Sequence, residues 1–138
     1  MARAIQAILV LTVVVALTLT SVLISVDAAD SMITAGQSLG ADQYLQNGPY
    51  KFIMQSDCNL VLYVNQNTAL WSSKTNGAGT SCTATLRNDG SLAVQSGTNI
   101  LWSSGTTGGT NSYWLIVQTD GNVVIYGSPL WATGTVQS

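Results

Sequence analysis

Two nine-residue segments of the chain carry polar side chains at identical spacing. Both follow the pattern Gln-x-Asp-x-Asn-x-Val-x-Tyr, with Gln55, Asp57, Asn59, Val61 and Tyr63 in one and Gln118, Asp120, Asn122, Val124 and Tyr126 in the other. An ionised carboxylate accepts strongly from a hydroxyl, whereas amides and phenols offer both donors and acceptors. Valine adds an apolar patch for the C–H groups of a ring. The set therefore suits neighbouring sugar hydroxyls and needs no metal ion.

Asp and Asn also favour tight turns, so turn chemistry alone is an alternative explanation of the pattern. It accounts for the Asp-Gly pairs but not for Gln and Tyr at matching offsets, which favours binding. A third copy keeps only Asp89 and carries Arg87, Ser91, Ala93 and Gln95 at the other positions. We therefore expect two working sites, with Arg87 able to pair with Asp89 and occupy its carboxylate.

The three copies begin at residues 55, 87 and 118, and this self-similarity at intervals of 32 and 31 residues indicates a repeat architecture. Each copy is followed by a Leu-Trp pair, namely Leu70-Trp71, Leu101-Trp102 and Leu130-Trp131. Asp-Gly dipeptides between alternating runs predict hairpins. We expect strands at residues 51–55, 83–87 and 114–118, at 59–64, 91–95 and 122–126, and at the Leu-Trp pairs, with further candidates at 33–39 and 43–46.

Period-two alternation assigns the two faces of each hairpin. One face is apolar in all three repeats and is expected in the core, with Leu60, Leu62, Leu92, Val94, Val123 and Ile125. The opposite face, which carries the polar pattern, is expected to meet solvent or ligand. The tryptophans of the Leu-Trp pairs are expected to meet in a shared core, and stacking on sugars is the alternative. Trp114 has no counterpart in the other repeats.

The composition argues against several classes of function. The chain has four basic and six acidic residues, no His, and a net charge of −2. It lacks the basic surface that nucleic-acid binding needs, and it has no His for a nucleophile–base arrangement. Its acidic residues stand singly in separate repeats, which argues against a two-carboxylate glycosidase. We predict a protein that is not an enzyme and that uses no cofactor or metal ion.

The first 28 residues differ in kind from the rest of the chain. Arg3 precedes a long apolar run that ends in a small-residue pattern at Ala28, as signal peptidase prefers. We predict a signal peptide at residues 1–28, followed by one domain at 29–138 without a membrane span. An uncleaved membrane anchor is the alternative. The predicted destination is the extracellular space or the vacuole.

The chain contains two cysteines, Cys58 and Cys82. In a secreted protein an even number of cysteines fits a disulfide, and two buried free thiols are the alternative. A bridge would close a loop of about 25 residues and stabilise the fold by roughly 3 kcal/mol on the chain-entropy model.

The two intact patterns, the repeat spacing, the Leu-Trp pairs and the cysteine pair resemble the monocot (bulb-type) mannose-binding lectins over residues 30–134. The resemblance implies an all-β fold, the β-prism II, with three four-stranded antiparallel sheets around a pseudo-three-fold axis. It implies that Asp57 and Asn59 bind the axial 2-hydroxyl of mannose. It further implies that Gln55 binds the 3-hydroxyl, that Tyr63 binds the 4-hydroxyl and that Val61 packs on the ring carbons. The same roles are implied in the third repeat for Gln118, Asp120, Asn122, Val124 and Tyr126. It also implies the bridge Cys58–Cys82.

From these observations we predict a lectin that recognises mannose-containing glycans and glycoproteins in plant defence. The alternative is a defence or taste-modifying protein-interaction module on the same fold, with weak or lost sugar binding. The resemblance also allows a homodimer built by exchange of a carboxy-terminal strand, for which residues 130–136 are the candidate, and monomeric relatives are equally part of the family.

Overall fold

The computed structural model describes residues 30–109, 112–127 and 131–138. Within these ranges the chain forms twelve β-strands and no helix, as expected for a sequence rich in Thr, Val and Ile and broken by Gly and Asn. The predicted signal peptide at residues 1–28 and the predicted strand residue Leu130 lie outside these ranges. No helix in the described part of the chain could span a bilayer.

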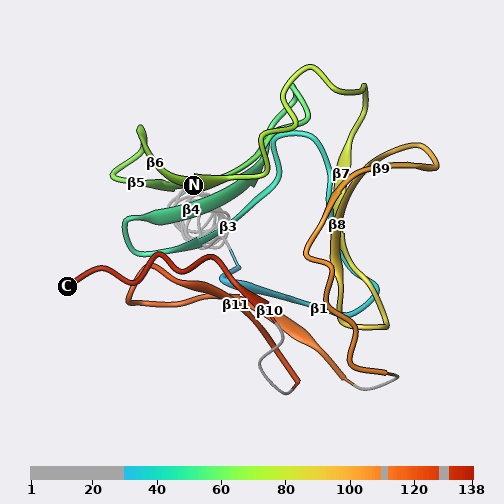
Figure 1. Cartoon of the computed structure of the whole chain (residues 1–138). Helices are drawn as coiled ribbons and strands as arrows, with labels where there is room; N and C mark the ends of the chain where they lie inside the picture. The colour runs from blue at the N-terminus through green and yellow to red at the C-terminus, as the bar shows by residue number, and fades with distance from the viewer. Residues whose placement is uncertain (1–29, 110–111, 128–130) are drawn as a thin grey trace, which may run out of the picture.

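The strands form three four-stranded antiparallel sheets (Figure 1). The first sheet contains β3 (Tyr44–Asn47), β4 (Tyr50–Met54), β5 (Leu60–Val64) and β6 (Thr68–Ser72). The second contains β2 (Ser38–Leu39), β7 (Thr83–Leu86), β8 (Leu92–Ser96) and β9 (Asn99–Ser103). The third contains β1 (Met32–Thr34), β10 (Trp114–Val117), β11 (Val123–Tyr126) and β12 (Trp131–Ala132). The sheets stand as the three sides of a prism, which confirms the expected β-prism II arrangement.

Each sheet combines one sequence repeat with one short strand from the amino-terminal segment. Strands β1, β2 and β3 join the third, second and first sheets in that order. The segment 33–39, expected to supply strand structure, contains parts of two strands, because β1 and β2 belong to different sheets. Gly36 lies between them at a φ of 92°, and its N–H donates to the Leu86 carbonyl at 2.7 Å. Glycine adopts such a φ at little cost, so the chain can turn here from one sheet to the next.

The three hairpins turn through the same three-residue loop, whose last residue has a positive φ. That residue is Cys58 in the first repeat and Gly90 and Gly121 in the others, with φ values of 72°, 87° and 83°. In the first loop the Gln55 N–H donates to the Asn59 carbonyl, and the Cys58 N–H donates to the Gln55 carbonyl. The same two bonds recur in the other loops. This is the hairpin loop in which a type I turn is followed by a left-handed residue, and it holds the preceding Asp identically in all three repeats.

The apolar face of every hairpin points to the interior, as predicted. Leu60, Leu62, Leu92, Val94, Val123 and Ile125 have no exposed surface. The rings of Trp71, Trp102 and Trp131 meet near the axis, with centroids 5.2 to 5.5 Å apart in edge-to-face contacts, a favoured aromatic geometry. They pack against the core while remaining partly exposed. The prediction of a shared tryptophan cluster is confirmed.

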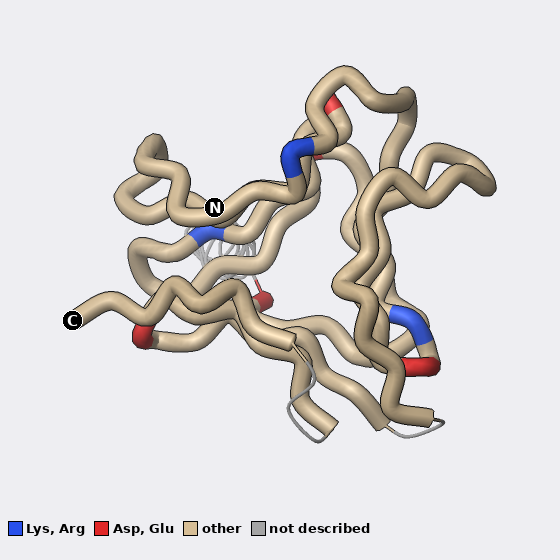
Figure 2. The backbone as a smooth tube through the Cα atoms, in the orientation of Figure 1, with Lys and Arg blue, Asp and Glu red and all other residues tan. Residues whose placement is uncertain are grey.

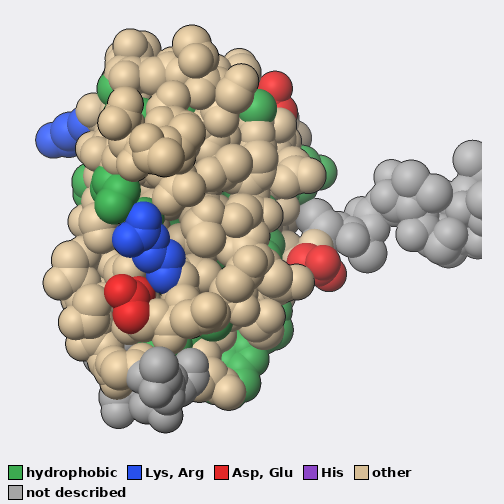
Figure 3. Space-filling view, turned by 90° about the vertical axis from the view of Figure 1, so that its right-hand side faces the viewer, with side chains coloured by type: hydrophobic (Ala, Val, Ile, Leu, Met, Phe, Trp, Pro, Cys, Tyr) green, Lys and Arg blue, Asp and Glu red, His purple; other side chains and the backbone are tan. Residues whose placement is uncertain are grey.

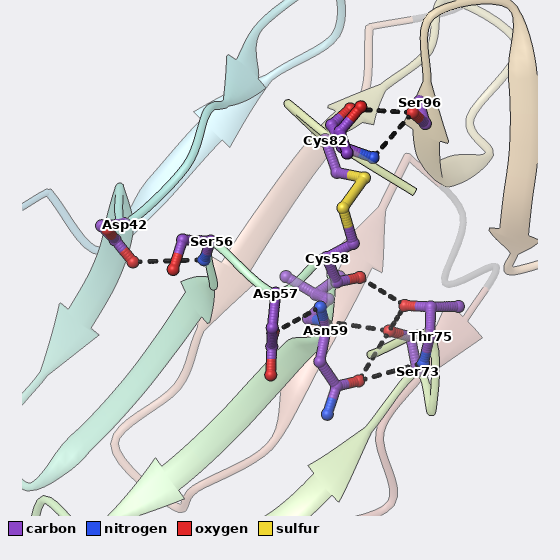
Figure 4. The surroundings of a disulfide bond; sticks show 11 residues. Asp42, Ser56, Asp57, Cys58, Asn59, Ser73, Thr75, Cys82 and Ser96 are labelled. Carbon is purple, nitrogen blue, oxygen red and sulfur yellow. Dashed lines mark hydrogen bonds between the residues drawn. A yellow bond between two sulfur atoms is a disulfide. The ribbon is translucent and has the colours of Figure 1, made fainter. Parts of the chain in front are cut away.

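One disulfide links two of the sheets. Cys58, in the loop between β4 and β5, is bonded to Cys82, immediately before β7. Figure 4 shows this bridge beside Asp57 and Asn59, which flank Cys58 in the same loop. The predicted pairing is therefore confirmed, and the loop that carries the first polar pattern is tied covalently to the second sheet.

Candidate functional site

In the first repeat the polar residues of the pattern lie on the outward side of β4 and β5. In the third repeat they lie on the outward side of β10 and β11. Gln55 follows β4 and Tyr63 lies on β5, and the Gln55 amide donates to the Tyr63 hydroxyl at 2.6 Å. The Gln118 amide donates to the Tyr126 hydroxyl in the same way. Each pair therefore fixes the orientation of an amide oxygen and a phenolic O–H before any ligand arrives.

The aspartates of both repeats are held by the backbone of their own loops. Asp57 Oδ1 accepts from the Asn59 N–H at 2.9 Å, and Asp120 Oδ1 accepts from the Asn122 N–H at 3.0 Å. This local bond is the turn chemistry that Asp commonly supplies. The second carboxylate oxygen has no partner among the described residues, so it can accept from a ligand hydroxyl. One Asp thus serves the turn and the site together.

The asparagines present their amide nitrogens because their oxygens are already bonded. Asn59 Oδ1 accepts from the Ser73 hydroxyl and the Thr75 N–H at 3.3 and 3.2 Å. Asn122 Oδ1 accepts from the Thr133 hydroxyl and the Gly134 N–H at 2.9 and 3.0 Å. In Figure 4 the Asp57 carboxylate and the Asn59 amide point to the same side of the hairpin. A donor and an acceptor therefore lie side by side, as one sugar hydroxyl requires.

A pair of hydroxyl residues behind each asparagine is a feature that the sequence predictions missed. The Ser73 hydroxyl bonds the Thr75 hydroxyl at 2.7 Å, and Thr75 donates to the Cys58 carbonyl at 2.6 Å. In the third repeat the Thr133 hydroxyl bonds the Thr135 hydroxyl, and Thr135 donates to the Gly121 carbonyl. The signal was present in the sequence, because Ser or Thr stands two residues after each repeat tryptophan and Thr stands four residues after it. These hydroxyls position the asparagines from the side away from the ligand.

The valines of the pattern form the floor of each site rather than an open patch. Val61 is 2% exposed and Val124 is 5% exposed, although both lie on the face that was expected to meet solvent or ligand. Val61 is opposite Ile53 on one side and Ser72 on the other, and these neighbours and the taller polar side chains cover it. A sugar ring can touch each valine only through the small area between the polar groups.

The second repeat keeps the loop and changes the side chains. Arg87 donates to Gln95 Oε1 at 3.3 Å, so these two residues bond across the hairpin as Gln and Tyr do in the other repeats. Asp89 Oδ1 accepts from both the N–H and the hydroxyl of Ser91, at 2.9 and 2.7 Å. Oδ1 of Asp89 is therefore engaged twice by Ser91, and the expected partner Arg87 donates to Gln95 instead.

The serine hydroxyl also changes the acidity of Asp89. Its hydrogen bond to the carboxylate, together with that of the Ser91 N–H and the charge of Arg87, lowers the pKa of Asp89 below its usual value. Hydrogen bonds and a nearby positive charge both favour the ionised form. The second repeat thus presents a charged Arg, an engaged Asp and a short Ser in place of the open donor–acceptor set.

The surface around these hairpins carries few charges. Figure 2 shows Lys, Arg and Asp at scattered positions, with one basic and one acidic position close together on the second sheet. Figure 3 shows the face formed by that sheet, where basic and acidic side chains lie beside one another on a mostly uncharged surface. In the described ranges no three His, Cys, Asp or Glu residues lie close enough to hold a metal ion. Each of the two intact polar sets contains one charged acceptor, the Asp carboxylate, among neutral hydrogen-bonding groups.

No family model matches the sequence, but individual proteins do. A mannose-specific lectin of Aloe arborescens is 51% identical to this chain over 108 residues, which cover 77% of this chain and 98% of that lectin. This identity extends over nearly the whole of the relative and includes the three repeats.

Solved structures of mannose-binding lectins are also similar to this chain. A monomeric monocot mannose-binding lectin from Gastrodia elata has a TM-score of 0.75 at 46% identity, over 78% of this chain and 99% of that one. The snowdrop (Galanthus nivalis) agglutinin, solved with methyl α-D-mannoside, has a TM-score of 0.69 at 40% identity, over 79% of this chain and all of that one. Both structures thus match this chain over more than three quarters of its length.

Proposed function

The chain belongs to the family of the monocot mannose-binding lectins, and from that premise we propose that its first and third repeats each bind one mannose unit of a glycan without a metal ion. The observation that carries this proposal is the matched set of pre-positioned polar groups in those two repeats. Each set contains a held carboxylate, a held amide and a Gln–Tyr pair on one face of a hairpin.

The proposed chemistry follows from which atoms remain unbonded. The second oxygen of Asp57 accepts from the axial 2-hydroxyl of mannose, and Asn59 Nδ2 donates to the same oxygen atom of the sugar. Gln55 Oε1 accepts from the 3-hydroxyl, and the Tyr63 O–H donates to the 4-hydroxyl. The neighbouring Val61 contacts the ring carbons through its small exposed area. The third repeat uses its equivalent side chains in the same roles, which are those of Gln118, Asp120, Asn122, Val124 and Tyr126.

Two weak sites on one small domain favour branched ligands. A shallow polar site binds a monosaccharide with a Kd of about 1 mM, or roughly −4 kcal/mol. Two such sites that meet one glycoprotein gain avidity without any new contact. We therefore propose mannose-rich glycoproteins as the partners, encountered in plant defence.

The proposed location and chemistry of the protein are consistent with this role. We propose that residues 1–28 direct the chain into the secretory pathway and that the domain at 29–138 acts outside the cell or in the vacuole. The chain contains no His and no Glu, and Asp57, Asp89 and Asp120 lie in separate repeats. This supports a binding protein rather than a catalyst, since acid–base chemistry on sugars needs paired groups.

Retention on mannose-agarose tests the proposal. The wild-type protein is expected to be retained and to elute with free mannose, because both sites are intact. The double variant Asp57→Asn and Asp120→Asn is expected to flow through, because the side-chain carbonyl of Asn keeps the loop bond while the charged acceptor is lost. The matched control is Asp89→Asn, which makes the same change in the second repeat and is expected to leave retention unchanged.

Thermal unfolding of each variant accompanies the column, and the melting temperatures are expected to agree closely. Retention of the double variant would show that the sites are misplaced. Flow-through of folded wild-type protein would favour the alternative, a protein-interaction module that has lost sugar binding.

A further inference from the structure

Trp114 is the one tryptophan in the described chain outside the central cluster. Its side chain is 38% exposed, whereas the rings of Trp71, Trp102 and Trp131 pack against one another and against the core. The two neighbours of Trp114 in the sequence, Tyr113 and Leu115, are buried. Trp114 is large, partly exposed and separate from the tryptophan cluster, so it is a candidate contact for a ligand.

The register of the third sheet places Trp114 beside the site of that repeat. Trp114 is directly opposite Tyr126 on β11 and opposite Thr34 on β1. Directly opposed residues of antiparallel strands project from the same face with their Cβ atoms about 5 Å apart. The side chains of Trp114 and Tyr126 are therefore neighbours on the outward face that carries the polar set.

The direction of Tyr126 shows at which end of the site Trp114 stands. The Tyr126 hydroxyl accepts from the Gln118 amide, so its ring leans along the hairpin toward the turn. The proposed mannose lies on that turn-facing side, over Val124. Trp114 lies at the opposite end of the same face, on the side of Tyr126 that is away from the turn. A sugar linked to the bound mannose at this end would extend over the indole.

The surroundings of Trp114 leave room for such a unit. A hollow of about 270 Å³ opens beside it, lined by Thr34, Ala35, Ser112, Tyr113 and Trp114. Met32, one outward position along β1, is 39% exposed. The hollow is slightly smaller than the pockets that hold drug-sized ligands, and it combines apolar area with hydroxyl groups at its rim.

The equivalent positions of the other repeats are different in kind. Opposite Tyr63 in the first repeat stands Lys51, whose ammonium lies 4.1 Å from the centroid of the Tyr44 ring. Opposite Gln95 in the second repeat stands Thr83. At this position the third repeat therefore carries an aromatic side chain where the first repeat carries Lys51, and the exposed Tyr44 of the first sheet lies instead opposite Ile53.

We propose that Trp114 forms a second subsite of the third repeat, which binds the next hexose of a mannose-containing glycan by stacking. The proposal rests on the proposed function, because it requires a first mannose in the neighbouring polar set. The face of an indole carries excess negative charge, and the C–H hydrogens on one side of a pyranose carry a small positive charge. The indole N–H can in addition donate to a ring hydroxyl.

Calorimetric titration of single-site proteins tests this proposal. In an Asp57→Asn background only the third repeat binds, and the ligands are methyl α-mannoside and the α-linked dimannosides. We expect at least one dimannoside to bind about tenfold more tightly than methyl α-mannoside, equivalent to about 1.4 kcal/mol. Adding Trp114→Thr, the residue found at the same position of the second repeat, is expected to remove that advantage and to leave methyl α-mannoside binding unchanged.

The matched control is Lys51→Thr in an Asp120→Asn background, where only the first repeat binds. It changes the equivalent position and is expected to alter the ratio of dimannoside to methyl α-mannoside affinity less than twofold. If the third repeat binds methyl α-mannoside and the dimannosides equally tightly, the proposed subsite is wrong, whereas the proposed function still stands. A parallel loss of monosaccharide and disaccharide binding on Trp114→Thr would also overturn it, since Trp114 would then support the first site.

Two further results separate the remaining explanations. If the Asp57→Asn protein does not bind methyl α-mannoside at all, the proposed site of the third repeat fails and the subsite fails with it. If Trp114→Thr changes the sedimentation coefficient, the exposed indole serves contact between copies of the chain, which would also overturn the subsite. An unchanged sedimentation coefficient with a lost dimannoside advantage supports the proposal.

Discussion

The second repeat has the same backbone as the first and third and almost none of their outward chemistry. All three share the loop with a left-handed last residue, the fully buried inward side chains and the aspartate held by the N–H two residues on. Only the outward residues differ, with Arg87, Ser91, Ala93 and Gln95 replacing the intact set. The comparison shows that the loop, the inward side chains and the held aspartate persist where four outward residues change, and under the proposed function those four residues decide sugar binding.

This separation has a physical basis in the two-residue period of a strand. Inward side chains must fill one shared core, so a change there creates a cavity or a clash. Outward side chains in the second repeat still bond one another, as Arg87 does with Gln95 and Ser91 with Asp89. The second repeat therefore keeps these polar groups hydrogen-bonded although it lacks the intact polar pattern.

The largest expected effect is the gain of a third site. The variant Arg87→Gln, Ser91→Asn, Ala93→Val and Gln95→Tyr gives the second repeat the intact pattern on an unchanged backbone. We expect calorimetric titration with methyl α-mannoside to give three binding sites per chain in place of two. Ala93 is fully buried, but Val61 and Val124 occupy the same register position in the other repeats, so the added methyl groups should fit.

The control for this variant is the same set of substitutions with Asp89→Asn added. It is expected to return the stoichiometry to two with an unchanged melting temperature. A four-residue variant that folds and still binds two equivalents would show that the outward residues alone do not decide binding.

A smaller effect is expected from the hydroxyls behind the asparagines. Thr75→Val removes the bond to the Cys58 carbonyl and leaves a buried acceptor unpaired, which should lower the free energy of unfolding in urea by about 1–2 kcal/mol. Because Asn59 is held by the same network, we expect mannose affinity of the first repeat to fall about fivefold, or about 1 kcal/mol. The affinity is measured in an Asp120→Asn background.

Thr106→Val is the matched change in the second repeat, where the Thr106 hydroxyl bonds Ser104 at 3.0 Å and no asparagine follows Asp89. It is expected to leave mannose affinity unchanged in the same background. Equal losses of affinity from the two valine variants would mean that the hydroxyls act on overall stability and not on the position of Asn59.

The smallest effect concerns the acidity of Asp89. The variant Ser91→Ala removes the hydroxyl that donates to this carboxylate, and the pKa of Asp89 should rise toward its ordinary value. Because folding lowers the pKa of Asp89, its contribution to stability is present above the unfolded-state pKa of about 3.9 and is lost as the pH falls through the lower, folded-state pKa. Carboxyl NMR titration measures the change.

Ser91→Thr keeps the hydroxyl and should keep the low pKa of Asp89. If Ser91→Ala leaves the titration of Asp89 where it was, the backbone N–H and Arg87 are sufficient to account for the lowered value.

The parts of this molecule that could be predicted from the sequence are those with a local signal. The period-two pattern identified the inward residues, and the spacing of the repeats identified three equivalent hairpins and the tryptophan cluster. Residues 33–39 were expected to contribute strand structure, but their sequence concealed a change of sheet at Gly36, because alternation shows which face a residue takes and not which partner strand it meets. The partner of Met32 is Ile116, far along the chain.

The candidate site likewise contains contacts between strands that the sequence pattern could not predict. The polar pattern identified Asp57, Asn59 and their neighbours, but not the hydroxyls of Ser73 and Thr75 that hold Asn59, because a sequence pattern on one strand does not reveal what lies behind it. The burial of Val61 was likewise not predicted, since it results from neighbours on both flanking strands.

The order in which β1, β2 and β3 join the sheets has a consequence for synthesis. A ribosome releases the amino-terminal strands first, yet β1 must wait for its partner β10, which is among the last strands to emerge. Pairings so distant in sequence are slow to form because loop closure must precede them. The strands that are synthesised first are therefore the last to pair, and the three-sheet fold can be completed only when the nascent chain is almost complete.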